Sequence, residues 1–234
     1  MACYVPFNSR NLDISFFIFR PTIVYVDSLI DALKQFSSYT DSLGCVHSSI
    51  FTSIHGSMIV WYGAWMKRSD ENKQLLIAAL ISVLTNMVES MAILIDHSFF
   101  DAYAGESRDG SPAAKFFTGD VVAMSSAILS GDCESNALSF AYAFLAIFKD
   151  QFLKMEGAAA GVCFKSKTMP KIVGLVVWKS LHSFYTYVLA SDFRNRILPY
   201  FDGFAVDIKY DVFRVAYVSG QNGLDQPLQG GLET

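Results

Sequence analysis

The segment at residues 96–103, DHSFFDAY, carries the residue types best suited to acid–base chemistry. A histidine ionises near neutral pH, so His97 is a candidate general base. We expect the carboxylate of Asp101 to orient it and the phenol of Tyr103 to accompany it in an apolar pocket. Asp96 is a poor orienting partner, because neighbouring strand residues point to opposite faces. The competing interpretation, which we favour, is a solvent-facing or hydrogen-bonded histidine at a bend.

Large aromatic side chains form a second set of candidates, in this case for ligand binding. Trp61, Trp65 and Trp178 fall in apolar runs that read as strands, and Tyr210 and Tyr217 lie in the last apolar segment. Aromatic side chains of this size dominate the buried area of any core, so we favour a core role for the tryptophans.

Metal and cofactor sites are not predicted. The four histidines have no common helical spacing and no cysteine neighbours at ligand distance; they are His47, His55, His97 and His182. Glycine-rich nucleotide loops, the nucleophile elbow and the zinc-protease motif do not occur. We therefore expect no metal, no cofactor and, on balance, no catalysis.

The composition is apolar for a chain of 234 residues. Hydrophobic residues make up 52% and charged residues 17%, where about 25% charged is typical. This excess predicts an extra buried surface: a small apolar ligand, a protein partner or a homo-oligomer. The net charge of -4 argues against nucleic acid as a partner.

Location is predicted from the cysteines and the apolar runs. The longest apolar run, residues 137–148, is too short for a bilayer span, so no transmembrane segment is expected. The four cysteines lack paired spacing, which indicates a reduced, intracellular protein. We expect a cytoplasmic location and leave the nucleus open.

The chain contains an internal sequence repeat. Residues 92–105 (AILIDHSFFDAYAG) resemble residues 205–220 (AVDIKYDVFRVAYVSG), and each follows a Val-Trp pair. Hydrophobic periodicity predicts a strand, a helix, two strands, a helix and a strand in each half. The expected elements of the first half are 12–19, a helix capped by Asp27, 46–52, 58–65, a helix capped by Ser69, and 91–95. Those of the second are 121–129, 135–157, 161–165, 171–178, 181–201 and 204 onward.

This order predicts an α+β fold: a tandem duplication of a ferredoxin-like β-α-β-β-α-β unit, with antiparallel sheets, helices packed on one face and pseudo-twofold symmetry. We expect a first repeat at 1–110, a second repeat packed on it at 111–220, and a disordered tail at 221–234. The apolar phase slips near residues 98–100 and 211–212, which predicts a bulge or bend at each.

The sequences of several segments resemble those of a plant-restricted protein family known as a domain of unknown function. These segments are MACYVPFNSRNLDISFFIFRPT, SIHGSMIVWYGAWMKRS, AILIDHSFFDAYAGESRDG and AAKFFTGD. The likeness runs from Met1 to about Gly220. It implies an intracellular land-plant protein and no particular activity.

The predicted function is a non-catalytic small-molecule-binding or protein-interaction module that uses the seam between the halves. The alternative is a cofactor-independent lyase, isomerase or cyclase with His97 as general base.

Overall fold

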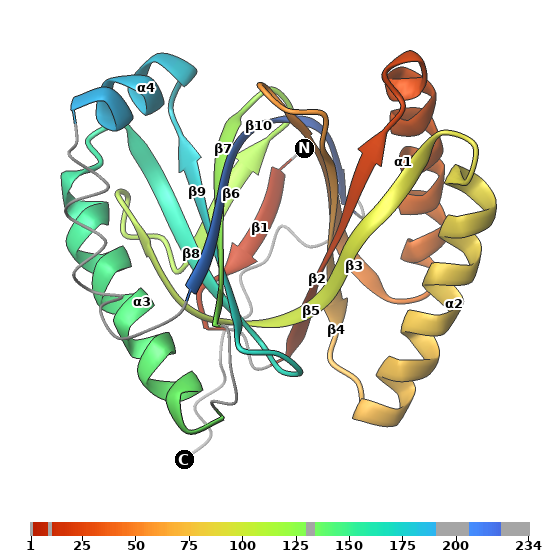
Figure 1. The fold of residues 1–234 in the computed structure, drawn as a ribbon, viewed down its shortest axis with the longest axis horizontal. Coiled ribbons are helices and arrows are strands. Elements are labelled where there is room, and N and C mark those ends of the chain that lie inside the picture. The colour runs from red at the N-terminus through yellow and green to blue at the C-terminus, as the bar shows by residue number, and fades with distance from the viewer. Residues whose placement is uncertain (1, 9–10, 130–133, 191–205, 221–234) are drawn as a thin grey trace.

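The computed structural model describes residues 2–8, 11–129, 134–190 and 206–220. Within these ranges, strands close into an antiparallel barrel in the order β10-β3-β4-β2-β5-β8-β9-β7, and β1 pairs with β6 in a separate small sheet (Figure 1). The strands are β1 (Ala2–Pro6), β2 (Leu12–Pro21), β3 (Cys45–Ser53), β4 (Ile59–Met66), β5 (Ala92–Ser107), β6 (Ala113–Phe117), β7 (Val121–Leu129), β8 (Ala158–Ser166), β9 (Lys171–Trp178) and β10 (Val206–Gly220). The helices are η1 (Ile23–Tyr25), α1 (Val26–Asp41), α2 (Asp70–Val88), α3 (Glu134–Lys154) and α4 (Leu181–Ala190).

Two long strands close the barrel. The first part of β5 pairs with β2 as far as Phe100, and from Phe100 onward β5 pairs with β8. In the same way β10 pairs with β7 as far as Arg214 and with β3 from Phe213 onward. Each long strand therefore joins two sets of strands into one continuous sheet.

The predicted fold class, a tandem ferredoxin-like duplication with pseudo-twofold symmetry, is wrong. The expected strand at 91–95 is in fact a strand of 16 residues, β5. Its second half pairs with β8, so no pair of separate antiparallel sheets forms. Register shifts lie between Ala102 and Ala104 and between Val215 and Tyr217, a few residues beyond the predicted bends.

The barrel lumen is filled with apolar side chains. Every barrel strand contributes to one buried cluster, and Phe16, Phe100 and Phe164 pack edge to face within it. The small β1-β6 sheet adds Cys3, Val5, Ala114 and Phe116 to the same cluster. The Phe116 ring lies 6.2 Å from that of Tyr62, so this sheet closes one end of the lumen.

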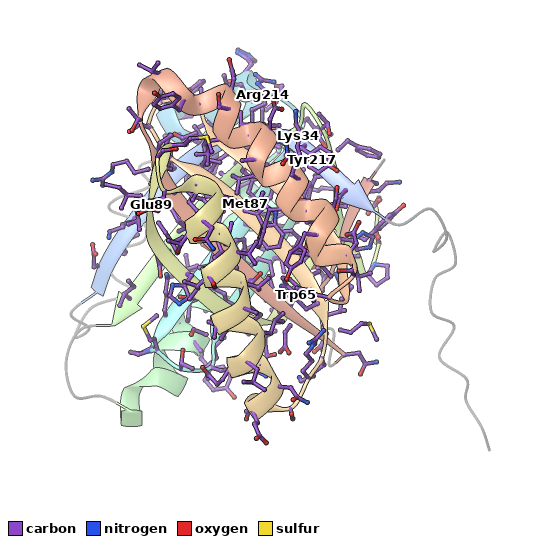
Figure 2. The ribbon with its side chains drawn as sticks, turned by 90° about the vertical axis from the view of Figure 1, so that its right-hand side faces the viewer. Lys34, Trp65, Met87, Glu89, Arg214 and Tyr217 are labelled. Carbon is purple, nitrogen blue, oxygen red and sulfur yellow. The ribbon has the colours of Figure 1, made fainter. Side chains whose placement is uncertain are left out.

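The helices cover the outside of the barrel. α1 and α2 pack on β2, β3 and β4, and α3 and α4 pack on the strands of the second half (Figures 1 and 2). α2 starts at the predicted cap Ser69, whose hydroxyl accepts the backbone N–H of Asn72. Its buried stripe of Leu76, Leu80, Leu84 and Val88 follows the four-residue spacing of a helix face.

Other sequence predictions have mixed outcomes. The strands expected at 12–19, 121–129 and 171–178 are confirmed as β2, β7 and β9. The predicted cap Asp27 is wrong, because α1 has Tyr25 at its N-cap. The division at 110/111 stays a prediction, and residues 191–201 and the tail at 221–234 lie outside the described residues. In the described part of the chain, no helix is long and apolar enough to cross a membrane.

Candidate functional site

A large apolar cavity lies outside the barrel, between α3 and strands β7, β9 and β10; we call it the α3 cavity. It encloses an empty volume of about 800 Å³, which includes its opening to solvent. Aromatic and aliphatic side chains form most of its wall, among them Phe144, Phe148, Val176, Trp178, Ile208 and Tyr210. A cavity of this kind suits a flat, apolar ligand.

On the other side of the barrel, under α1 and α2, a serine and a glycine face each other on neighbouring strands, and tryptophan side chains fill the space beside them. On the β2-β4 ladder, Ser15 stands opposite Gly63. The side chains two positions before and after this glycine are Trp61 and Trp65, both fully buried. Their indole N–H groups donate to Ser37 Oγ at 2.9 Å and to Ser15 Oγ at 2.8 Å. The two rings therefore fill this space and satisfy its polar groups.

The same pair recurs under α3, but with smaller neighbours. Ser125 stands opposite Gly174 on the β7-β9 ladder. Here the side chains two positions before and after the glycine are Ile172 and Val176. A Cβ on Gly174 would lie only 3.2 Å from the Phe144 ring, so this ring packs directly against β9 at the glycine. Replacing two indoles by two aliphatic side chains leaves the α3 cavity open.

Polar groups are few in the α3 cavity, and one of them is unpaired. Trp178 is 2% exposed and its indole N–H has no hydrogen-bond partner among the described residues. Leaving a buried donor unpaired costs about 1–3 kcal/mol. Gln151 is engaged, since its amide oxygen accepts the Tyr187 hydroxyl at 2.9 Å and its amide nitrogen donates to Asp150. The Trp178 indole nitrogen has almost no solvent-accessible surface, so a ligand acceptor reaches its N–H only when neighbouring side chains move.

Tyr210 forms the rim of the α3 cavity and stacks on Phe184 with centroids 6.0 Å apart. Desolvation, with a smaller contribution from the neighbouring Tyr187, raises the pKa of the Tyr210 phenol. The phenol therefore remains protonated in neutral solution.

The candidates His97, Asp101 and Tyr103 are not gathered at one point. His97 is exposed on β5 and stacks on Phe17 with centroids 6.0 Å apart. The Asp101 carboxylate faces Lys167 at 3.3 Å and Lys67 at 3.7 Å.

Tyr103 lies under α3, where its hydroxyl donates to the Ala141 carbonyl at 3.4 Å. Burial raises the pKa of this phenol. None of His97, Asp101 and Tyr103 is among the described residues that line the α3 cavity. Their catalytic roles stay predictions.

The aromatic candidates divide between the two sides of the barrel. Trp61 and Trp65 lie in the core under α1 and α2, and Tyr217 packs against the same cluster. Trp178 and Tyr210 line the α3 cavity. Ser125 and Phe144, which also line the α3 cavity, were not predicted from the sequence. An alignment of Gly63 with Gly174 would have shown that the tryptophans beside Gly63 are replaced by smaller side chains beside Gly174.

Metal binding finds no support in the described ranges, where no group of three or more His, Cys, Asp or Glu side chains is placed to hold an ion. The described cysteines, Cys3, Cys45 and Cys163, are free thiols and buried.

Comparison with known proteins gives a partial family match and a clear fold match. A family model described as Domain of unknown function (DUF7392) matches residues 98–213, so this part of the chain carries that domain. No curated protein matches the sequence. An anthrone oxidase-like protein superposes with a TM-score of 0.67 at 13% identity, covering 93% of this chain and 96% of that one.

Two further solved structures share the fold. A protein from Fusobacterium nucleatum assigned as a monooxygenase has a TM-score of 0.61 at 14% identity, covering 92% of this chain and 97% of that one. A heme-binding protein from Thermus thermophilus has a TM-score of 0.52 at 8% identity, covering 92% and 93%.

The expected function is corrected by these comparisons. A non-catalytic module at a seam between two halves was predicted, whereas the strands form one closed barrel and the similar structures are named as an oxidase-like protein and a monooxygenase. The alternative, a lyase, isomerase or cyclase with His97 as general base, would place that base on the outer face of β5, where His97 is exposed.

Proposed function

We propose that this protein is an oxygen-consuming enzyme that oxidises a flat, largely apolar aromatic molecule bound in the α3 cavity. The observation that carries the proposal is the cavity itself, with the unpaired indole N–H of Trp178 in its wall. The names of the oxidase-like and monooxygenase structures support the reaction class.

The shape of the site favours a planar ring system. Phe144 and Phe148 come from successive turns of α3, and both rings lie against strand glycines, Phe144 on Gly174 and Phe148 on Gly161. On the strand side, Val176 and Trp178 complete a wall of apolar atoms. An aromatic substrate held between these layers loses its water shell and gains offset-stacked ring contacts.

The Trp178 donor suits a substrate oxygen that carries negative charge in the reaction. A ketone with an acidic ring methylene loses a proton to solvent and forms an enolate. The N–H of Trp178, once neighbouring side chains move to open it to the cavity, would stabilise the enolate oxygen, as a fixed donor does at an oxyanion. The electron-rich carbon then reacts with dioxygen: the CH₂ group becomes C=O, one oxygen atom is retained, and the other leaves as water.

A heme does not fit the described part of this site. Proteins hold heme iron mainly through histidine, cysteine thiolate or tyrosinate. Among the described residues of the α3 cavity there is no histidine or cysteine, and the raised pKa of Tyr210 opposes tyrosinate formation. Where proteins bind heme iron through a methionine thioether, a histidine is the second ligand. Met155 has no such histidine partner among the described residues of the cavity. The proposal therefore derives no step from heme.

The test uses anthrone as the probe substrate. We expect protein-dependent oxygen uptake above the spontaneous rate, with formation of the ketone product carrying one atom from ¹⁸O₂. Val176→Trp places an indole two positions after Gly174, as Trp65 stands after Gly63, and should remove at least about 90% of the turnover by filling the cavity.

Val24→Trp is the matched control, because Val24 is 82% exposed and lies outside the cavity. Oxygen uptake that equals the spontaneous rate across a panel of tricyclic aromatic ketones would contradict the proposal. Full turnover in a folded Val176→Trp protein would place the reaction elsewhere.

The resemblance to a plant-restricted family supports extending the domain match from residues 98–213 to most of the chain and assigning the protein to the cytoplasm of plant cells. Binding of a small molecule is the partner class that the cavity supports, and homo-oligomer formation stays a prediction.

A further inference from the structure

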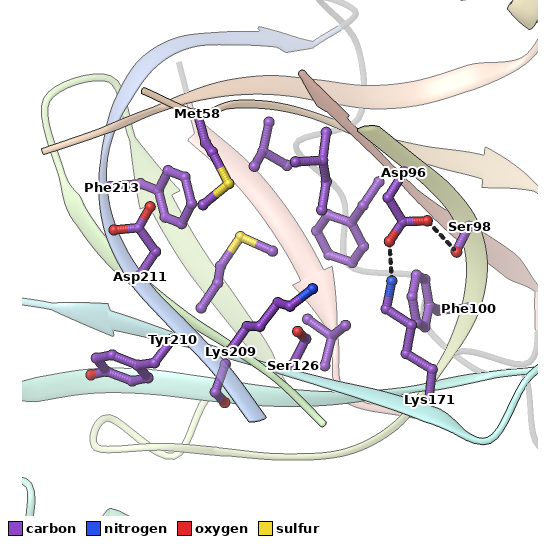
Figure 3. Close-up of a pocket in the computed structure, with 16 residues that line it drawn as sticks. Met58, Asp96, Ser98, Phe100, Ser126, Lys171, Lys209, Tyr210, Asp211 and Phe213 are labelled. Carbon is purple, nitrogen blue, oxygen red and sulfur yellow. Dashed lines mark hydrogen bonds and ion pairs between the residues drawn. The ribbon is translucent and has the colours of Figure 1, made fainter. Parts of the chain in front are cut away.

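The barrel has a second cavity at the end of the lumen opposite the β1-β6 sheet; we call it the mouth pocket. It has an empty volume of about 620 Å³, which includes its opening to solvent. Its floor consists of apolar side chains that face the lumen, among them Phe16, Val60, Phe100, Met124, Val173 and Phe213. Polar side chains stand above this floor (Figure 3). The pocket therefore has an apolar interior and a polar entrance.

A buried ammonium lies at this entrance. The Lys171 side chain is 5% exposed, and its Nζ contacts Asp96 Oδ2 in an ion pair. An ammonium has three N–H donors. Asp96 is the one hydrogen-bond acceptor of Lys171 in the described structure, and the Phe100 ring lies 5.8 Å from the same nitrogen. Lys171 thus keeps donor capacity at the entrance of the pocket.

The partner of Lys171 is already satisfied. Asp96 accepts the ammonium on one carboxylate oxygen and the Ser98 hydroxyl, at 3.3 Å, on the other. Both oxygens of Asp96 thus have a partner, whereas the Lys171 ammonium has one acceptor for its three N–H groups, and this favours a ligand that accepts hydrogen bonds. A carboxylate does so best, because charge-assisted bonds are about twice as strong as neutral ones.

A second lysine adds positive charge at the same opening. Lys209 reaches into the mouth pocket in Figure 3. Its ion-pair partner Asp207 is 3.7 Å away, and both side chains are more than half exposed, so this pair holds Lys209 weakly. The Lys209 ammonium can therefore turn toward an incoming anion.

Asp211 fixes the direction of such a ligand. Its Oδ1 accepts the backbone N–H of Val212, and its Oδ2 is buried without a partner among the described residues. Figure 3 places it beside Phe213, across the pocket from Lys171. An anionic group is repelled from that side and attracted to the Lys171 side.

We propose that the mouth pocket is a second binding site, which takes a small monocarboxylate with an apolar body. The carboxylate binds Lys171 and Lys209 at the entrance, and the apolar body lies on the floor formed by Val173, Met124 and their neighbours. The site is distinct from the α3 cavity, although Ser125 and Tyr210 border both.

The test measures binding of hexanoate to the full chain by NMR of labelled methyl groups. Met124 and Val173 line the mouth pocket and do not line the α3 cavity, so their signals report this site alone. We expect saturable shifts with hexanoate, and at least about tenfold weaker binding of hexanamide and hexylamine. Because the readout is binding, it does not depend on any turnover.

Variants assign the binding to the two lysines. Lys171→Met should weaken hexanoate binding by about tenfold or more, and Lys209→Gln by about threefold. If Lys171→Met alone does not fold, Lys171→Met with Asp96→Asn removes both charges of the pair together. Lys34→Gln is the matched control, since Lys34 is likewise an exposed lysine paired with a nearby aspartate.

Several results would overturn the proposal. Hexylamine that binds as tightly as hexanoate would assign the pocket to cations, held by Asp211. Unchanged binding in folded Lys171 variants, or no saturable shift of Met124 and Val173 with hexanoate, would show that the ammonium does not recognise a carboxylate here.

Discussion

The indole N–H of Trp65 donates to the hydroxyl of Ser15 across the β2-β4 ladder at 2.8 Å, and both groups are fully buried. The equivalent serine on the β7-β9 ladder, Ser125, faces the α3 cavity instead. One side of the barrel is therefore packed and its polar groups are paired, while the other side has space and an unpaired donor.

The first prediction concerns stability and compares two Trp→Phe changes. Trp65→Phe leaves Ser15 without its donor and removes buried ring volume, so it should lower the free energy of unfolding by about 2–4 kcal/mol. Trp178→Phe removes a donor that is unpaired in the described structure and should change this free energy by less than about 1 kcal/mol. Urea unfolding followed by tryptophan fluorescence and circular dichroism measures both. Equal losses would contradict the difference in packing.

The second prediction uses the same two variants to test the oxidation. Trp178→Phe keeps an aromatic ring in the α3 cavity but removes the donor, so turnover of anthrone should fall by about tenfold to a hundredfold. Trp65→Phe should keep its turnover below its unfolding temperature. Oxygen uptake at a temperature where both proteins are folded is the measurement. A Trp178→Phe protein with normal turnover would exclude the indole N–H from the reaction.

How much of this site follows from sequence depends on the kind of residue. Ser69 and the four-residue stripe of α2 follow local rules and were predicted. The length of β5 was not, because residues 96–107 mix Asp, His, Ser and Glu with apolar residues and bury their faces unevenly. Because β5 pairs with both β2 and β8, its length determines whether the strands form two sheets or one barrel. The error in the length of this strand therefore led to the wrong fold class.

The two cavities were also beyond sequence reasoning, for a different physical reason. Empty space is a property of several side chains from distant segments, such as Phe144 on α3 and Val176 on β9. Lys171 follows a turn and resembles an ordinary solvated lysine, yet it is 4% exposed. Only the closure of the barrel brings Asp96 to it.

The third prediction concerns Arg108, which joins the end of β5 to the end of α3. Its guanidinium donates to the carbonyls of Phe152, Leu153 and Met155 at 2.9, 3.2 and 3.0 Å. These carbonyls lie at or just past the helix C-terminus, where positive charge is favourable. Those of Phe152 and Met155 also accept the backbone N–H groups of Met155 and Ala158. Arg108→Met should therefore cost about 1–3 kcal/mol of unfolding free energy.

Arg214→Met serves as the control for Arg108, because Arg214 makes one exposed hydrogen bond, to the Gly119 carbonyl. It should cost less than about 1 kcal/mol. Thermal unfolding of both variants compares them directly, and a larger loss in Arg214→Met would refute a capping role for Arg108.

The fourth prediction is a pH dependence due to His47. Burial lowers the pKa of this histidine below its usual 6.5, and its Nδ1 has no partner in the described structure. The unfolded chain then binds more protons than the folded one below about pH 6.5, so stability should fall as the pH decreases through this region. His47→Phe should flatten the profile between about pH 7 and pH 5. Urea midpoints across this range measure it, and parallel profiles would rule out His47 as a source.

The double pairing of β5 and β10 sets the smallest piece of this protein that can fold. The family match begins at residue 98 and ends at residue 213, inside both of these strands. A polypeptide trimmed to that match would lose the β2 and β3 partners of the long strands and expose two open sheet edges, which promote aggregation. The recognisable signature is thus shorter than the cooperative unit, and expression of the matched segment alone should give insoluble material where the full chain gives a folded one.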